Sequence, residues 1–150
     1  MDLIRPVILT LAQSKSVQLV AILIVMDVLF GCLRALKEKT FNSTIGINGM
    51  IRKAGILTSL LFMAMIDNVI TLDLIGFIPE ALKNYLPVSQ VGVMEFFAII
   101  YIVYEVLSVL KNMALCGLPV NKIWQAVKNF LKNNTDEIID PDDIDHTEGE

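Results

Sequence analysis

The sequence is poor in the side chains that most enzymes and metal proteins use. Its 150 residues include one histidine, one tryptophan and two cysteines, Cys32 and Cys116. It shows no glycine-rich phosphate loop, no cluster with metal-ligand spacing and no nucleophile beside a plausible base. Two cysteines in apolar surroundings are too few for a disulfide framework or a zinc site. These absences predict a protein that is not an enzyme, has no metal or cofactor, and has no nucleic-acid partner.

Basic residues are absent from the last fifteen positions, which hold eight of the sixteen acids. The rest of the chain holds all twelve Lys and Arg against the other eight acids. The net charge of −4 therefore hides a basic body and an acidic tail. The amino end also lacks a basic cluster before its apolar run and an Ala-x-Ala site after it, so we expect no cleaved signal peptide.

Long hydrophobic runs are what the chain does have. Hydrophobic residues make up 55% of it, and three runs, residues 17–36, 55–75 and 91–110, approach the ~20 residues that a helix needs to cross a bilayer. The fold class predicted is an all-α membrane protein with about three transmembrane helices. We divide it into an N-terminal stub or short interfacial helix (1–16), a transmembrane domain (17–117), an amphipathic juxtamembrane helix (118–132) and an acidic disordered tail (133–150).

The distribution of basic residues predicts the topology. Residues 34–53 hold five basic side chains against one acid, whereas residues 73–90 hold only Lys83. Four more lysines follow the third run. By the positive-inside rule, the first loop and the carboxyl end face the cytoplasm and the amino end faces outward.

Each apolar run carries a carboxylate well inside it: Asp27, Asp67 and Glu105. An ionisable group at such a depth costs at least ~2.5 kcal/mol, so it should face protein, water or another polar group. Small and polar residues recur beside each carboxylate every three or four positions, which places them on one helix face. We predict a pore-lining or assembly role for Asp27, Gly31, Arg34, Ala35, Ser59, Asp67, Thr71, Glu105, Ser108 and Asn112.

Two arrangements of these stripes remain open. They can meet inside one protomer, with the carboxyls neutral or paired to Arg34, Lys53 or Lys111 and hydrogen-bonded to Ser, Thr, Tyr101 or Tyr104. Alternatively, protomers associate and turn some stripes toward a water-filled lumen. Both can hold in succession, which would give the protein two stable states.

A break followed by a second amphipathic segment comes after the third run. Gly117 and Pro119 are typical of a helix end and a helix start. From Val120 to Leu131 the apolar side chains fall on one face and the lysines on the other, so we expect a helix that lies on anionic lipid, although a partner-binding helix has the same pattern. The residues expected to anchor it are Trp124, Lys122, Lys128 and Lys132.

The ordered set of polar and small residues resembles the toxin-secretion/phage-lysis holin family over about residues 17–131. It reads Asp27-x-x-x-Gly31-x-x-Arg34-Ala35, Asn42-Ser43-x-x-Gly46-x-x-Gly49-x-x-Arg52-Lys53, Asp67, and Glu105-x-x-Ser108-x-x-Lys111-Asn112-x-x-x-x-Gly117-x-Pro119. The resemblance implies a homo-oligomer in the bacterial inner membrane that opens lesions at a set time. It also implies a cargo, either an endolysin or a large toxin, and allows for an antiholin partner.

Two rival functions have sequence features of their own. A small proton-coupled channel or carrier would use the same carboxylates as relay groups, but the chain shows no inverted repeat and no pair of broken helices. An antiholin or an inert membrane scaffold would form oligomers without conductance.

Overall fold

A computed structural model describes residues 4–39, 43–84 and 90–134, and every regular element in these ranges is a helix. The tail after residue 134, for which disorder was expected, lies outside the described residues. The helices are α1 (Ile4–Gln13), α2 (Lys15–Glu38), α3 (Ser43–Val69), α4 (Glu80–Lys83), α5 (Val93–Leu115) and α6 (Asn121–Asn134).

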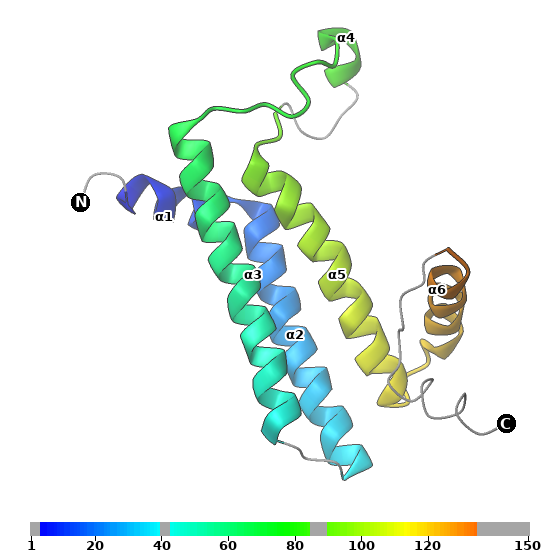
Figure 1. Cartoon of the computed structure of the whole chain (residues 1–150). Coiled ribbons are helices and arrows are strands. Elements are labelled where there is room, and N and C mark those ends of the chain that lie inside the picture. The colour runs from blue at the N-terminus through cyan, green and yellow to red at the C-terminus, as the bar shows by residue number, and fades with distance from the viewer. Residues whose placement is uncertain (1–3, 40–42, 85–89, 135–150) are drawn as a thin grey trace, which may run out of the picture.

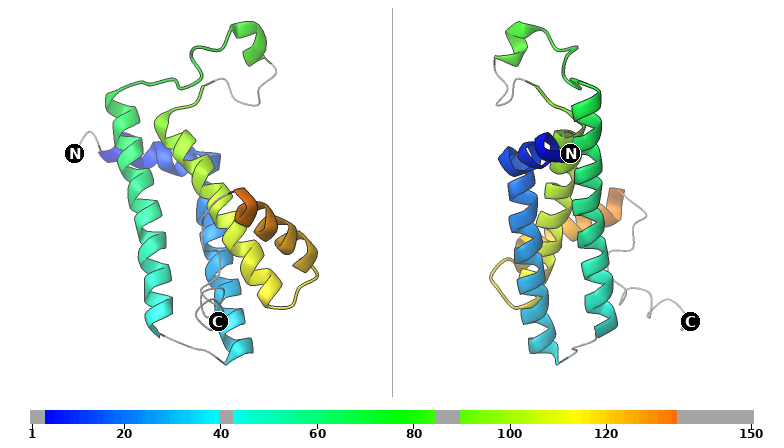
Figure 2. Two further views of the ribbon diagram at one scale, coloured as in Figure 1. Left: turned by 45° about the vertical axis from the view of Figure 1, so that its right-hand side comes forward. Right: turned by 90° about the vertical axis from the view of Figure 1, so that its left-hand side faces the viewer.

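Three of these helices, α2, α3 and α5, are long and apolar enough to cross a membrane. Helix α5 contacts both α2 and α3 and lies between them in the side view of Figure 2. Helix α1 crosses one end of this bundle and contacts α2 and α3, while α6 turns back beside α5 at the other end (Figure 1). We call these ends the α1 end and the α6 end. The predicted all-α fold with three membrane-spanning helices is confirmed.

Local signals in the sequence set the helix ends. Ser14 caps α2, because its Oγ accepts a hydrogen bond from the Val17 amide at 3.2 Å. After α5, Gly117 adopts a left-handed φ of 90°, and the amides of Gly117 and Leu118 donate to the carbonyls of Ala114 and Met113. This is a Schellman ending, which satisfies the last carbonyls of the helix. The break predicted at Gly117 and Pro119 thus separates α5 from α6.

The buried apolar core consists of aliphatic side chains and one methionine. Its buried members include Val20, Leu60, Ala64, Met94 and Ala98, contributed by the three long helices. Only 17%, 17% and 22% of the apolar windows of α2, α3 and α5 are buried inside the protein. Most of their apolar surface therefore faces outward, as expected for helices surrounded by lipid.

The second long helix is displaced along the sequence from the predicted run. It was expected over residues 55–75, whereas α3 begins at Ser43 and ends at Val69. The early start includes Arg52 and Lys53, charged residues that a hydropathy reading places outside the run. At the other end, Asp73 Oδ1 accepts hydrogen bonds from the amides of Ile75 (3.1 Å) and Val91 (3.3 Å), which form a turn instead of a further helical stretch.

Candidate functional site

A cluster of charged side chains lies between the three long helices. Lys53 on α3 forms ion pairs with Asp27 on α2, at 2.7 Å between Nζ and Oδ2, and with Glu105 on α5. The other carboxylate oxygen of Asp27 accepts a hydrogen bond from Asn112 Nδ2 of α5 at 2.9 Å. We call Asp27, Lys53, Glu105 and Asn112 the charge cluster. It joins all three long helices through a single lysine.

The charge cluster is buried and holds more negative than positive groups. Glu105 is fully buried, Asp27 is 9% exposed, and the Lys53 side chain is 13% exposed. Two carboxyl groups thus face one ammonium group, and Glu105 Oε1 has no hydrogen-bond partner among the described residues. A buried charge is stable only while its partner is in place, because its hydration has been lost. The arrangement therefore depends on all three helices staying together.

Helical spacing explains how the sequence builds this cluster. Glu105 and Asn112 are seven residues apart, which places both on the same face of α5. Gly31 follows Asp27 by one turn of α2 and lies against Asn112, whose Nδ2 is 3.7 Å from where a Cβ would sit. Lys53 has a side chain long enough to carry its ammonium group from α3 to the other two helices.

Further polar contacts join α3 to α5 along their length. Ser59 Oγ and the Tyr101 hydroxyl are 2.8 Å apart, and Arg52 Nη1 donates to the Tyr104 hydroxyl at 3.2 Å. With the Lys53–Glu105 pair, these contacts form a series that we call the polar rungs. Ser59 meets Tyr101, whereas Arg52 and Lys53, one to two turns earlier on α3, meet residues that come later on α5, so the two helices run antiparallel.

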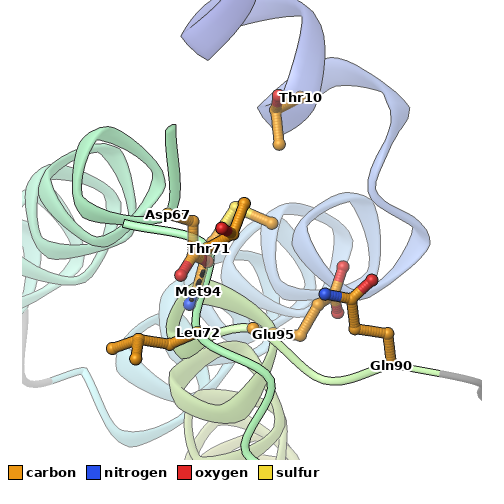
Figure 3. Close-up of a pocket in the computed structure, with 8 residues that line it drawn as sticks. Thr10, Asp67, Thr71, Leu72, Gln90, Met94 and Glu95 are labelled. Atoms are coloured by element: carbon orange, nitrogen blue, oxygen red, sulfur yellow. Dashed lines mark hydrogen bonds between the residues drawn. The ribbon is translucent and has the colours of Figure 1, made fainter. Parts of the chain in front are cut away.

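Asp67 provides the rung nearest the α1 end, where it caps another helix. Its Oδ1 accepts a hydrogen bond from the Val93 amide at 2.9 Å, and its Oδ2 accepts one from the Met94 amide at 2.8 Å. These are the first amides of α5, which have no partner inside their own helix. A carboxylate is favourable there because the amino end of a helix carries partial positive charge. Figure 3 shows Asp67 beside Met94.

Gly31, beside the charge cluster, and Gly92, beside Asp67, should respond differently to an added methyl group. At Gly92, a Cβ would lie 2.7 Å from Asp67 Oδ2, too close for both atoms to keep their places. We expect Gly92→Ala to lower the free energy of unfolding by about 1–3 kcal/mol through overpacking. Gly31→Ala should be neutral or stabilising by up to about 1 kcal/mol, because its new methyl group fits and alanine favours the helix. Chemical unfolding in detergent micelles measures both; equal losses would contradict this reading of the two positions.

A small pocket opens beside Asp67 at the α1 end, with a volume of about 240 Å³. Thr71, which lies beyond the end of α3, lines it together with Thr10, Gln90 and Glu95 (Figure 3). Glu95 Oε1 accepts a hydrogen bond from Ser14 Oγ at 2.7 Å, which ties α5 to the start of α2. Among the residues that the structure describes, no group of three or more His, Cys, Asp or Glu could hold a metal ion here or elsewhere.

Three other predicted stripe residues, Arg34, Ala35 and Ser108, contribute no side chain to the charge cluster. Arg34 pairs with Glu38 one turn along α2, at 3.1 Å, instead of with Asp27 or Glu105. Ala35 and Ser108 are half-buried. Of the three cations considered as partners for the buried carboxyls, the structure uses Lys53.

Helix α6 is amphipathic as predicted, but its apolar side chains divide between two faces. Trp124 is only 5% exposed, and α6 has its helix contacts with α5. Ile123 and Phe130, seven residues apart, are 58% and 66% exposed. The anchor predicted from Trp124 is therefore buried, and these two side chains supply the exposed apolar surface.

The lysines of α6 occupy a third face. Lys122 and Lys132 are exposed, and Lys128 is half-buried. The helix contains no acidic residue.

Several contacts could not be identified from the sequence. The bond from Ser14 to Glu95, the turn made by Asp73 and the close approach of Gly92 to Asp67 join segments far apart in the chain. Gly92 has the one recognisable local signal, a glycine directly before an apolar helix, which is compatible with an N-cap.

The model of the bacteriophage holin family matches residues 8–133, from α1 to the last turn of α6. The chain belongs to the bacteriophage holin family. A curated relative, the holin-like protein TcdE of Clostridioides difficile, is 38% identical over 129 residues, which cover 85% of this chain and 78% of the relative. No solved structure matches. This holin is a bacterial membrane protein, and its acidic tail lies beyond the matched residues.

Proposed function

We propose that this holin assembles into homo-oligomers in the bacterial inner membrane and opens lesions there at a set time. The observation that carries the proposal is the charge cluster, in which two carboxyl groups and a lysine are buried between three helices that are otherwise apolar. Such groups are costly in a membrane and usually serve a function there. We infer that their role here is conformational.

The cluster supports a switch between two states. In the protomer, Lys53 neutralises part of the carboxylate charge, and the polar faces of the three helices meet one another. If protomers associate and the helices part, water reaches the same groups and replaces their buried partners. The residues proposed to line the lesion or control assembly are those of the stripes: Asp27, Gly31, Arg34, Ala35, Ser59, Asp67, Thr71, Glu105, Ser108 and Asn112.

We propose that the α6 end faces the cytoplasm and the α1 end faces outward, as the surplus of basic residues favours. Helix α6 then lies at the inner membrane surface. Ile123 and Phe130 contact lipid and anchor the helix, and Lys122, Lys128 and Lys132 lie at the depth of the headgroups.

The cargo that best fits a holin lesion is a muralytic enzyme made in the cytoplasm, or a large toxin. The C. difficile relative is a holin-like protein, a description that specifies no cargo. A second copy of this chain is the partner that assembly requires, and an antiholin is a further candidate partner.

The experiment is a time course of membrane potential and turbidity in bacteria that express the chain, with and without a cytoplasmic muralytic enzyme. We expect sudden depolarisation in both cultures and lysis only with the enzyme. Depolarisation without enzyme-dependent lysis would instead indicate a small channel. Cells that keep their potential would indicate an antiholin or scaffold.

A further inference from the structure

The exposed lysines of α6 form a cationic surface with no acid on the same helix. Lys122 and Lys132 are exposed, and the helix sequence contains only Lys, Asn and Gln as polar residues. Two further lysines, Lys37 and Lys39 at the end of α2, are also exposed. Lys37 Nζ donates to the Leu115 carbonyl at 3.1 Å, so the end of α2 lies beside the end of α5, close to where α6 begins.

The segment that follows this helix has the opposite charge. Residues 136–150 hold eight acids and no Lys or Arg. The first of them, Asp136, comes four residues after Lys132. We propose that residues 136–150 fold back on α6 of the same chain and cover its lysines, so that the tail, and not anionic lipid, neutralises this surface.

The length of the tail is sufficient for this contact. A helix of 14 residues such as α6 is about 21 Å long at ~1.5 Å per residue. Fifteen residues of extended chain can reach up to about 50 Å at ~3.3 Å per residue. The tail can therefore follow α6 back to Lys122 and extend further to Lys37 and Lys39.

Charge and attachment favour the tail over the lipid surface as occupant. Both would bring anionic oxygens to the lysines, but the tail is on the same chain, which gives it a high local concentration. The tail also carries more negative charge than α6 carries positive charge, so it is itself repelled by anionic headgroups. Ile123 and Phe130 are exposed and provide apolar surface for contact with lipid.

The first test locates the tail. Full-length protein is reconstituted into vesicles of phosphatidylcholine and phosphatidylglycerol in equal parts and treated with a carbodiimide, which joins amines to carboxylates in direct contact. An equal mixture of isotopically light and heavy protein shows whether the joined residues belong to one chain. We expect links from Lys122 and Lys132 to residues 136–150 within one chain, reduced by high salt. Links mainly between light and heavy chains, or no links to these lysines, would overturn the proposal.

The second test measures which lipid lies beside α6. Trp124 is the only tryptophan of the chain and lies in α6, so its energy transfer to a dansyl group reports lipids near this helix. We compare dansyl-labelled phosphatidylglycerol with dansyl-labelled phosphatidylcholine in the same vesicles. For the wild type we expect nearly equal transfer to the two lipids. Replacing the eight acids by Asn and Gln should shift the ratio toward phosphatidylglycerol, by up to about fivefold for each lysine released.

Two control variants separate the effect of the tail's charge from the effect of its residue order. Shuffling the order of residues 136–150 keeps the charge and should leave the ratio as in the wild type. Adding Lys122→Gln and Lys132→Gln to the neutral tail should remove the preference for phosphatidylglycerol. An unchanged ratio with the neutral tail would overturn the proposal. Neither test depends on lesion formation. The tail contact can therefore be disproved while the proposed holin function holds, and the holin function can be disproved while the tail contact holds.

Discussion

Replacing Lys53 with methionine is expected to lower the free energy of unfolding by about 3–5 kcal/mol, the usual loss when one partner of a buried ion pair is removed. Methionine keeps much of the length and apolar volume of the lysine but leaves Asp27 and Glu105 facing one another without a cation. If burial of the cluster holds the protomer closed, the variant should also depolarise the host membrane earlier at equal expression. Denaturant titration in detergent micelles and the membrane-potential time course measure the two effects.

The neighbouring cation is the matched control for this substitution. Arg52→Met makes the same change in charge one residue away, but Arg52 is exposed and its described partner is the neutral Tyr104 hydroxyl. We expect its effect to stay below about 1 kcal/mol, as for most exposed polar contacts.

The carboxyl groups can then be removed together with the lysine. Adding Asp27→Asn and Glu105→Gln to Lys53→Met should recover much of the lost stability, because no uncompensated charge remains buried. A stable Lys53→Met variant with normal timing, or a triple variant no better than the single one, would show that the cluster does not hold the helices together.

The second large effect is expected at Asp67. Asp67→Ala removes the acceptor for the amides of Val93 and Met94, and we expect a loss of about 2 kcal/mol, in the range for a lost helix cap or a bond to a charged group. Asp67→Asn retains one side-chain carbonyl and should lose less. Hydrogen exchange should become faster at the first amides of α5 and remain slow near its centre.

Asn68 offers a control beside it on the same helix. Its Nδ2 donates to the Ala64 carbonyl of its own helix at 2.8 Å, so Asn68→Ala breaks no contact with α5. We expect the hydrogen exchange of Val93 and Met94 to be unchanged in this variant. If hydrogen exchange at Val93 and Met94 became equally faster in both alanine variants, Asp67 would not be the cap of α5.

Helix number, helix type and the break before α6 could be predicted because each has a local cause. Long apolar runs gave the three spans, and Gly117 with Pro119 marked the end of α5. The carboxylates at 27 and 105 were expected to need partners, and the structure provides them. The sequence could not identify which cation pairs with these carboxylates. Depending on how the helices are rotated about their axes, the partner could be Arg34, Lys53 or Lys111.

The structure differs from the sequence-based predictions where tertiary contacts override the hydropathy pattern. Residues 70–75 are mostly apolar, so they were counted in the second span, yet Asp73 binds backbone amides there and forms a turn. This shift places Asp67 two residues from the end of α3 and brings it to the start of α5. For α6, the amphipathic pattern could not show that Trp124 faces protein, since a buried face and a lipid-facing face have the same composition.

The polar rungs also limit how α3 and α5 can move against each other. Sliding by one helical turn, about 5.4 Å, would take Ser59 away from Tyr101 and Lys53 away from Glu105 in the same step. A full slide would therefore cost both contacts together. A rotation that parts the helices from the α6 end can instead break the contacts in order, with the Asp67 cap at the α1 end as the pivot. The order of these contacts along the two helices therefore predicts that α3 and α5 part from the α6 end and do not slide past one another.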